Sequence, residues 1–165
     1  MPLNDSVMYE EQMRQIDGIL VRLRADANAR AAFLIDRNGQ QIAASGENLE
    51  LLDATSLASL TAGNVASTDA LAGLIGEREF SALVHEGEKD NLHISLVNRR
   101  IIMVILFDER SSLGLVRLRV RRATTDLITV FEDLDRIQTA QVATGSGAPS
   151  PFAEITDADI DSLFA

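Results

Sequence analysis

The chain has 165 residues, of which 46% are hydrophobic and 4% aromatic, as expected for one folded domain with an aliphatic core. Its net charge of −10 at pH 7 argues against nucleic acid or an anionic membrane as the main partner. The absence of cysteine excludes disulfides and thiol chemistry. The longest apolar run, residues 101–107, is too short to span a bilayer, and acidic residues precede any long apolar run at the N-terminus. We therefore expect a cytoplasmic protein without a signal peptide.

The first part of the chain predicts a helix followed by a β-hairpin. Apolar residues recur at intervals of three and four over residues 6–26, which is the pattern of an amphipathic helix. These residues are Met13, Ile16, Leu20 and Leu23. Residues 32–35 and 41–45 then read as two strands. Asn38-Gly39 between them predicts a two-residue turn in which both residues take positive φ.

Residues 53–76 predict a helix with two unlike faces, capped by Asp53, Thr55 or Ser56. One side carries large apolar residues that we expect to face the core. They are Leu57, Leu60, Leu71 and Ile75. The opposite side carries small residues, namely Ser59, Ala62, Gly63, Ala66, Ala70 and Gly73. Either this helix packs tightly on its own sheet, or its small face docks against a partner.

The second half of the chain predicts three strands, over residues 80–85, 92–96 and 101–107. In the second strand, large apolar residues alternate with His93 and Ser95, so we expect it to be buried on one face. The third strand is apolar at every position, which predicts a central strand covered on both faces.

Residues 111–138 follow as one long helix, because apolar residues recur there at heptad spacing. The alternation over residues 116–121 is also compatible with a strand, but the longer pattern favours the helix. The resulting order, α-β-β-α-β-β-β-α, contains two hairpins and no βαβ alternation. It predicts an α+β fold for residues 1–138, with a five-stranded antiparallel sheet flanked by helices.

Two further segments follow this domain. Residues 139–151 are small, uncharged and rich in Gly, Ser and Pro, which predicts a flexible linker. Residues 152–165 predict a short acidic amphipathic helix. Its apolar residues are Phe152, Ile155, Ile160, Leu163 and Phe164. A tethered helix of this kind either folds back on its own domain or inserts into a groove on a partner.

The sequence offers little for catalysis. His85 and His93 have no evident metal-ligating partners, and we expect them to be polar residues on a half-exposed sheet. There is no P-loop, dinucleotide fingerprint or nucleophile elbow, so we expect no cofactor and no metal. One basic cluster stands out, consisting of Arg117, Arg119, Arg121 and Arg122. It is a solvated helix face, a contact for an acidic partner, or the source of an arginine finger donated in trans.

Eight segments and the acidic DIDSLF end carry a family resemblance. They are VMYEE (7–11), DANA (26–29), DRNGQ (36–40), TSLASLTAGNVA (55–66), LIGE (74–77), HEG (85–87), SLGLVRLR (112–119) and SPFAEI (150–155). Together they resemble the Roadblock family, the dynein-light-chain-related regulators of small GTPases, and in particular its bacterial cell-polarity members. The resemblance covers nearly the whole chain.

The resemblance implies a homodimer in which edge strands pair into one continuous sheet and the helices of residues 53–76 lie side by side. The edge strand would be residues 80–85, with Phe80, Leu83, Val84 and His85 at the dimer interface. Two protomers would bind one Ras-like GTPase and accelerate GTP hydrolysis by repositioning the GTPase's own catalytic residues, without an arginine finger.

The resemblance also assigns partner contacts. The GTPase would dock on the small face of residues 53–76, where Ala70 stands at a position that is commonly glycine in the family. The C-terminal helix would contact the GTPase too, with nucleotide exchange as its expected role. The alternative is a Roadblock scaffold that binds a GTPase or another partner without changing hydrolysis. An enzyme in its own right is disfavoured, because no nucleophile or metal constellation is present.

Overall fold

The computed structural model describes the backbone of residues 2–144 and the side chains of residues 9–143. The elements are α1 (Pro2–Asp26), β1 (Ala31–Asp36), β2 (Gln41–Gly46), the 3₁₀ turn η1 (Leu49–Leu51), α2 (Ala54–Leu74), β3 (Ala82–Glu86), β4 (Asn91–Leu96), β5 (Ile101–Phe107) and α3 (Leu113–Thr144). The predicted order of helices and strands is confirmed. Within residues 2–144, no helix combines the length and hydrophobicity needed to cross a membrane.

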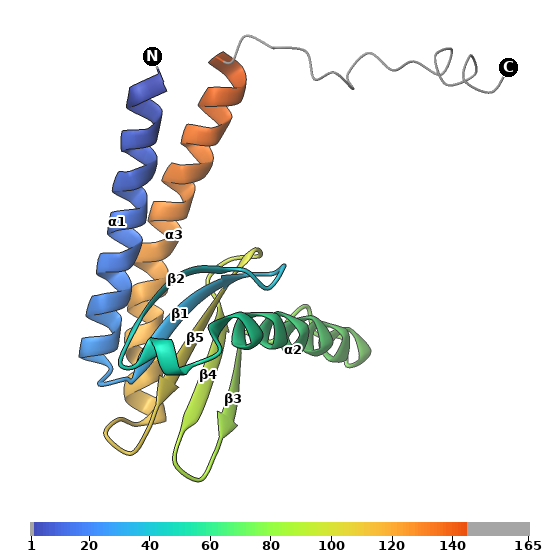
Figure 1. Cartoon of the computed structure of the whole chain (residues 1–165). Coiled ribbons are helices and arrows are strands. Elements are labelled where there is room, and N and C mark those ends of the chain that lie inside the picture. The colour runs from blue at the N-terminus through green and yellow to red at the C-terminus, as the bar shows by residue number, and fades with distance from the viewer. Residues whose placement is uncertain (1, 145–165) are drawn as a thin grey trace, which may run out of the picture.

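The five strands form one antiparallel sheet in the order β2-β1-β5-β4-β3. Strand β5 lies at its centre, and all of its residues except the half-buried Leu106 are buried, as the uninterrupted apolar run predicts. Helices α1 and α3 lie side by side on one face of the sheet, and α2 lies on the other (Figure 1). The molecule is therefore a three-layer α+β sandwich.

The layer of α1 and α3 holds the larger of the two cores. Buried residues of α3 follow the predicted heptad spacing, with Val116, Val120, Leu127 and Leu134 turned inward. Ser112 precedes α3, and its Oγ accepts the N–H of Leu115 at 3.2 Å. The helix continues to Thr144, so residues 139–144 are helical and the prediction of a flexible linker from residue 139 is wrong there. The predicted tail helix, residues 152–165, lies outside the described residues.

The β1–β2 hairpin differs from the predicted two-residue turn. Only Gly39 takes a positive φ, of 85°, and Asn38 does not. One oxygen of the Asp36 carboxylate accepts the backbone N–H groups of Asn38 and Gln40, at 2.9 Å each. A register shift between Leu34 and Ile35 accompanies the turn. These features make a three-residue loop with a bulge, in which a single left-handed residue suffices.

Strand β4 is buried on both faces, which corrects the prediction for its polar residues. His93 is 2% exposed and Ser95 is 7% exposed, and they pair in register with Ile105 and Met103 of the core beneath α1 and α3. Within the described part of the chain, His93 Nδ1 and Ser95 Oγ have no hydrogen-bond partner. Burial lowers the pKa of His93, and the positive charge of Arg117 lowers it further. His85, by contrast, is exposed as predicted.

We predict that His93→Leu reduces the loss of stability on acidification from pH 7.5 to pH 5. Because the pKa of His93 is lower in the folded protein, its stabilising contribution is complete above about pH 6.5 and is lost as the pH falls through the folded-state pKa. Urea unfolding at the two pH values measures this difference. The exposed His85→Leu is the control. Equal pH dependence of the wild type and His93→Leu would contradict the burial of a neutral His93.

Candidate functional site

Helix α2 presents an unusually small inner face to the sheet. The helix begins after Asp53, whose carboxylate accepts the N–H of Ser56 at 3.0 Å and its hydroxyl at 2.6 Å. These hydrogen bonds lower the pKa of Asp53. The buried residues of α2 are Ala58, Thr61, Ala62, Val65, Thr68 and Ala72. Small side chains let the helix lie close to the large residues of the sheet, such as Phe33 and Val104.

Of the four large residues predicted to face the core, Leu60, Leu71 and Ile75 do not, and the prediction is wrong for them. Leu57 is half-buried and packs against the core, as predicted, whereas Leu60 is 74%, Leu71 58% and Ile75 68% exposed. Leu74, at 83%, is exposed as well. The reason is volume: the sheet fills this core with its own large side chains, and only small ones fit beneath the helix.

The predicted small face is largely turned to solvent. Five of its six members are exposed, namely Ser59, Gly63, Ala66, Ala70 and Gly73. Ala62 is buried, at 9% exposure, so its assignment to the docking face is wrong. We call the exposed arc of α2 the outer face; it comprises Thr55, Ser56, Ser59, Leu60, Gly63, Ala66, Ser67, Ala70, Leu71, Gly73 and Leu74. Large and small apolar residues therefore share one surface, and sequence reasoning missed the leucines. A second stripe of residues with helical spacing could have indicated the true inner face. It consists of Thr61, Val65, Thr68 and Ala72.

An open sheet edge adjoins this surface. Strand β3 pairs only with β4 among the described strands, so its other side has no backbone partner there. The predicted edge strand is thus confirmed as an edge, although Phe80 precedes the strand itself. Leu83 and Val84 are half-buried, and His85 Nε2 lies 3.3 Å from Asn64 Nδ2 of α2. Residues of α2 and β3 also line a shared crevice that includes Val65, Phe80 and Leu83.

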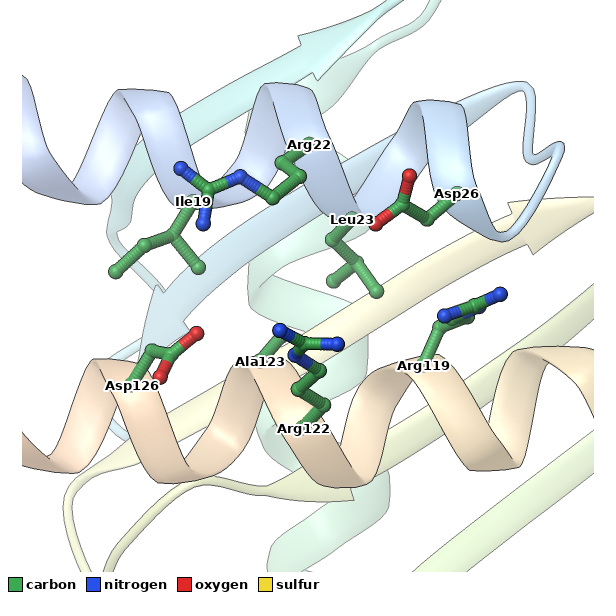
Figure 2. Close-up of a pocket in the computed structure, with 8 residues that line it drawn as sticks. All are labelled: Ile19, Arg22, Leu23, Asp26, Arg119, Arg122, Ala123 and Asp126. Atoms are coloured by element: carbon green, nitrogen blue, oxygen red, sulfur yellow. The ribbon is translucent and has the colours of Figure 1, made fainter.

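The basic cluster lies on the opposite layer of the molecule. Figure 2 shows Arg22 of α1 and Arg119 and Arg122 of α3 along the outer groove between the two helices, with Arg119 opposite Asp26. Asp26 and Asp126 line the same groove. Among the side chains of residues 9–143, none of these three arginines lies within 4 Å of a carboxylate. The sheet therefore separates this cluster from α2.

The described residues bear on chemistry in two respects, the grouping of metal-ligating side chains and the places of the two histidines. Within them, no group of three or more His, Asp or Glu residues is placed to hold a metal ion. His85 lies at the surface beside Asn64, whereas His93 is buried in the core. What the structure brings together is instead an exposed apolar helix and an open sheet edge. The fold and this surface define a protein-interaction module.

Comparison with known proteins identifies the module. Residues 15–107 match the Roadblock/LC7 domain, which is more than half of the chain. The structure resembles Myxococcus xanthus MglB with a TM-score of 0.71 and 50% sequence identity, over 74% of this chain and 91% of that one. The gliding protein MglB from Thermus thermophilus gives a TM-score of 0.70 and 34% identity, over 74% and 92%. The chain belongs to the Roadblock/LC7 family.

Two other comparisons complete this result. A structure described as MglB with a tetrameric arrangement gives a TM-score of 0.70 and 33% identity, over 74% of this chain and 91% of that one. No curated protein sequence matches the chain. The domain match and the MglB structures confirm the Roadblock resemblance of the sequence.

We predict that Gly63→Ala stabilises the isolated protein by up to about 1 kcal/mol, because alanine has the higher helix propensity. A Cβ at Gly63 would meet no atom within 4 Å, so the fold itself does not require glycine there. Urea unfolding gives the free energy. Gly46→Ala is the contrasting variant and should destabilise, because its Cβ would lie 2.6 Å from that of Ala31. Destabilisation by Gly63→Ala would show that the outer face is covered in the isolated protein.

Proposed function

We propose that the chain is a homodimeric GTPase-activating protein for a Ras-like bacterial polarity or motility GTPase of the MglA type. The observation that carries the proposal is the outer face of α2, exposed beside the open edge of β3 in a chain 50% identical to M. xanthus MglB. In this role the protein is a regulator, and the GTPase supplies the hydrolytic chemistry.

The open edge of β3 supports the proposed dimerisation. Pairing of two β3 strands would satisfy their free backbone groups and join the sheets of two protomers. The residues at this interface would be Leu83, Val84 and His85, with Phe80 beside them. Helix α2 extends past β3 in Figure 1, so this pairing would also bring two α2 helices together. Burial of exposed residues such as Leu74 and Ile75 would contribute roughly 1.5–3 kcal/mol each.

Docking of the GTPase on α2 would depend on shape rather than charge. Asp69 is the only charged residue of α2, and Arg37 binds its carboxylate at 2.6 Å. Gly63, Ala66 and Ala70 leave room for another backbone to approach the helix closely. Two protomers per GTPase would provide two such helices. A rigid apolar platform of this kind suits the ordering of mobile switch segments, which would position the GTPase's own catalytic residues.

Two finer proposals come from the family resemblance. The segment of residues 152–165 would contact the GTPase and promote nucleotide exchange. The protein would act in the cytoplasm, at a cell pole where its GTPase is regulated. Deletion of residues 145–165 would test the first proposal through the rate of nucleotide release, and a fluorescent fusion would test the second.

We predict that the chain accelerates GTP turnover by the MglA-like GTPase of its source by more than tenfold. A tenfold acceleration corresponds to an activation free energy lower by roughly 1.4 kcal/mol. Ala66→Arg with Ala70→Arg should abolish binding and acceleration, because two long charged side chains would fill the small surface. The matched control is Ala25→Arg with Ala143→Arg, two exposed alanines in α1 and α3. Binding without acceleration would leave a Roadblock scaffold, and binding by the Ala66/Ala70 variant would refute the docking surface.

We also predict that Arg78→Ala lowers the accelerated rate by less than tenfold. The basic cluster of α3 lies across the sheet from α2 and cannot reach a GTPase docked there, but exposed Arg78 follows α2 directly. An arginine finger would increase the rate of hydrolysis by a factor of about 10³–10⁵, so its loss would be plain in single-turnover assays. Arg99→Ala, an exposed arginine in the β4–β5 turn, is the control. A loss of about 10³ or more with Arg78→Ala alone would replace the proposed mechanism by a finger mechanism.

A further inference from the structure

A hollow lies where the helix pair leaves the sheet. Helices α1 and α3 continue beyond the end of the sheet at which the β1–β2 and β4–β5 turns lie (Figure 1). Between them and these turns is a space of about 470 Å³. Its size falls within the range of about 300–1,000 Å³ that is common for ligand pockets in proteins. The hollow is on the side of the sheet away from α2, and the docking surface does not include it.

Half of the residues that line the hollow are large and apolar, and most of these are continuous with the main core. Its six large apolar residues are Tyr9, Met13, Ile42, Ile101, Phe131 and Leu134. Ile101 and Leu134 are buried, while Met13, Ile42 and Phe131 are partly buried against the same core. Tyr9 is 52% exposed. Apolar side chains placed here would extend a core that already exists, which makes the hollow a suitable site for an amphipathic segment.

We propose that, in the protein without its GTPase, this hollow holds the chain's own C-terminal segment, residues 152–165. Gln138 lines the hollow, and α3 ends six residues later, at about 1.5 Å per residue or roughly 9 Å away. The seven residues 145–151 then span roughly 15 Å as a flexible chain and about 24 Å when extended. The segment can therefore return to the hollow of the same protomer.

The sequence of the segment matches the hollow. It contains five large apolar residues: Phe152, Ile155, Ile160, Leu163 and Phe164. It also contains four carboxylate residues and no Lys, Arg or His. The rim carries two arginines, Arg37 and Arg100, and two aspartates, Asp36 and Asp135. Arg37 binds Asp69 of α2 at 2.6 Å, and Arg100 binds Asp135 at 2.7 Å. Arg99 beside them is exposed, and no ion pair is recorded for it among the described residues. Arg99, next to the rim residue Arg100, is thus the cation that a carboxylate of the segment would meet.

Docking would regulate the availability of the segment. Tethering holds the segment close to the hollow at a high effective concentration, so even a weak site would be occupied. A partner that binds the segment would first have to withdraw it, which lowers the apparent affinity for that partner. This consequence rests on the proposed GTPase contact, whereas the docking itself does not need the GTPase and can be tested without it.

Spin labels on the full chain test the proposal, since the absence of native cysteine allows pairs to be placed freely. One pair joins the rim and the segment, at Asn38→Cys and Ser162→Cys. A reference pair joins Glu88→Cys, in the turn at the other end of β3, to Ser162→Cys. Pulsed electron resonance should give a short, narrow distance for the first pair and a longer one for the second. A broad distribution for the first pair would overturn the proposal.

A matched pair of substitutions identifies the site. Tyr9→Asp places a charge in the hollow and should reduce the short-distance population at least tenfold. Val21→Asp, at an α1 residue of nearly equal exposure (55%, against 52% for Tyr9) outside the hollow, should leave that population unchanged. An unchanged population in Tyr9→Asp would overturn the proposal. So would loss of the short distance when labelled protein is diluted into excess unlabelled protein, because the segment would then come from another protomer.

Discussion

The structure depends on β5, a strand with apolar residues on both sides and a neighbouring strand along each edge. Such a strand must be covered above and below, so the chain has to supply two helical layers. Helices α1 and α3 form one layer, and α2 alone forms the other. A single helix covers less of the sheet than a pair. The side of α2 is therefore where apolar surface and a sheet edge are left uncovered.

The two cores differ in whether the helices or the sheet supply the large side chains. Beneath α1 and α3, the helices contribute large residues such as Leu20 and Leu127. Beneath α2 the sheet contributes Phe33 and Ile35, and the helix contributes mostly alanine and threonine, with one valine, Val65. A close-packed interior cannot hold many large residues from both sides, so Leu60, Leu71 and Leu74 of α2 go outward. The same arrangement that fits α2 to its sheet creates the exposed surface that a partner would cover.

Sequence patterns predicted the elements well, because hydrophobic period reports which residues share a face. They predicted the α3 stripe and the central strand correctly, since only one of the two faces of α3 is apolar. They failed on α2, where two stripes have helical spacing and only the volume of the sheet decides which is inward. They also misplaced His93, because an alternating polar residue is a sign of exposure unless a helix covers it. The two-residue turn predicted from Asn38-Gly39 was wrong because the Asp36 side chain stabilises a longer loop.

The β1–β2 hairpin joins the two sides of the molecule physically. Its Gly39 lies against α2, where a Cβ would be 3.0 Å from Ser59 Cα, and its Arg37 lines the hollow while binding Asp69 of α2. A carboxylate in the hollow that drew Arg37 away would leave Asp69 as an unneutralised charge on an otherwise uncharged helix. That charge would stand on the helix proposed to dock the GTPase, where a partly buried unpaired carboxylate disfavours an apolar contact. The hairpin thus provides a short, contiguous path by which occupancy of the hollow could change binding at α2.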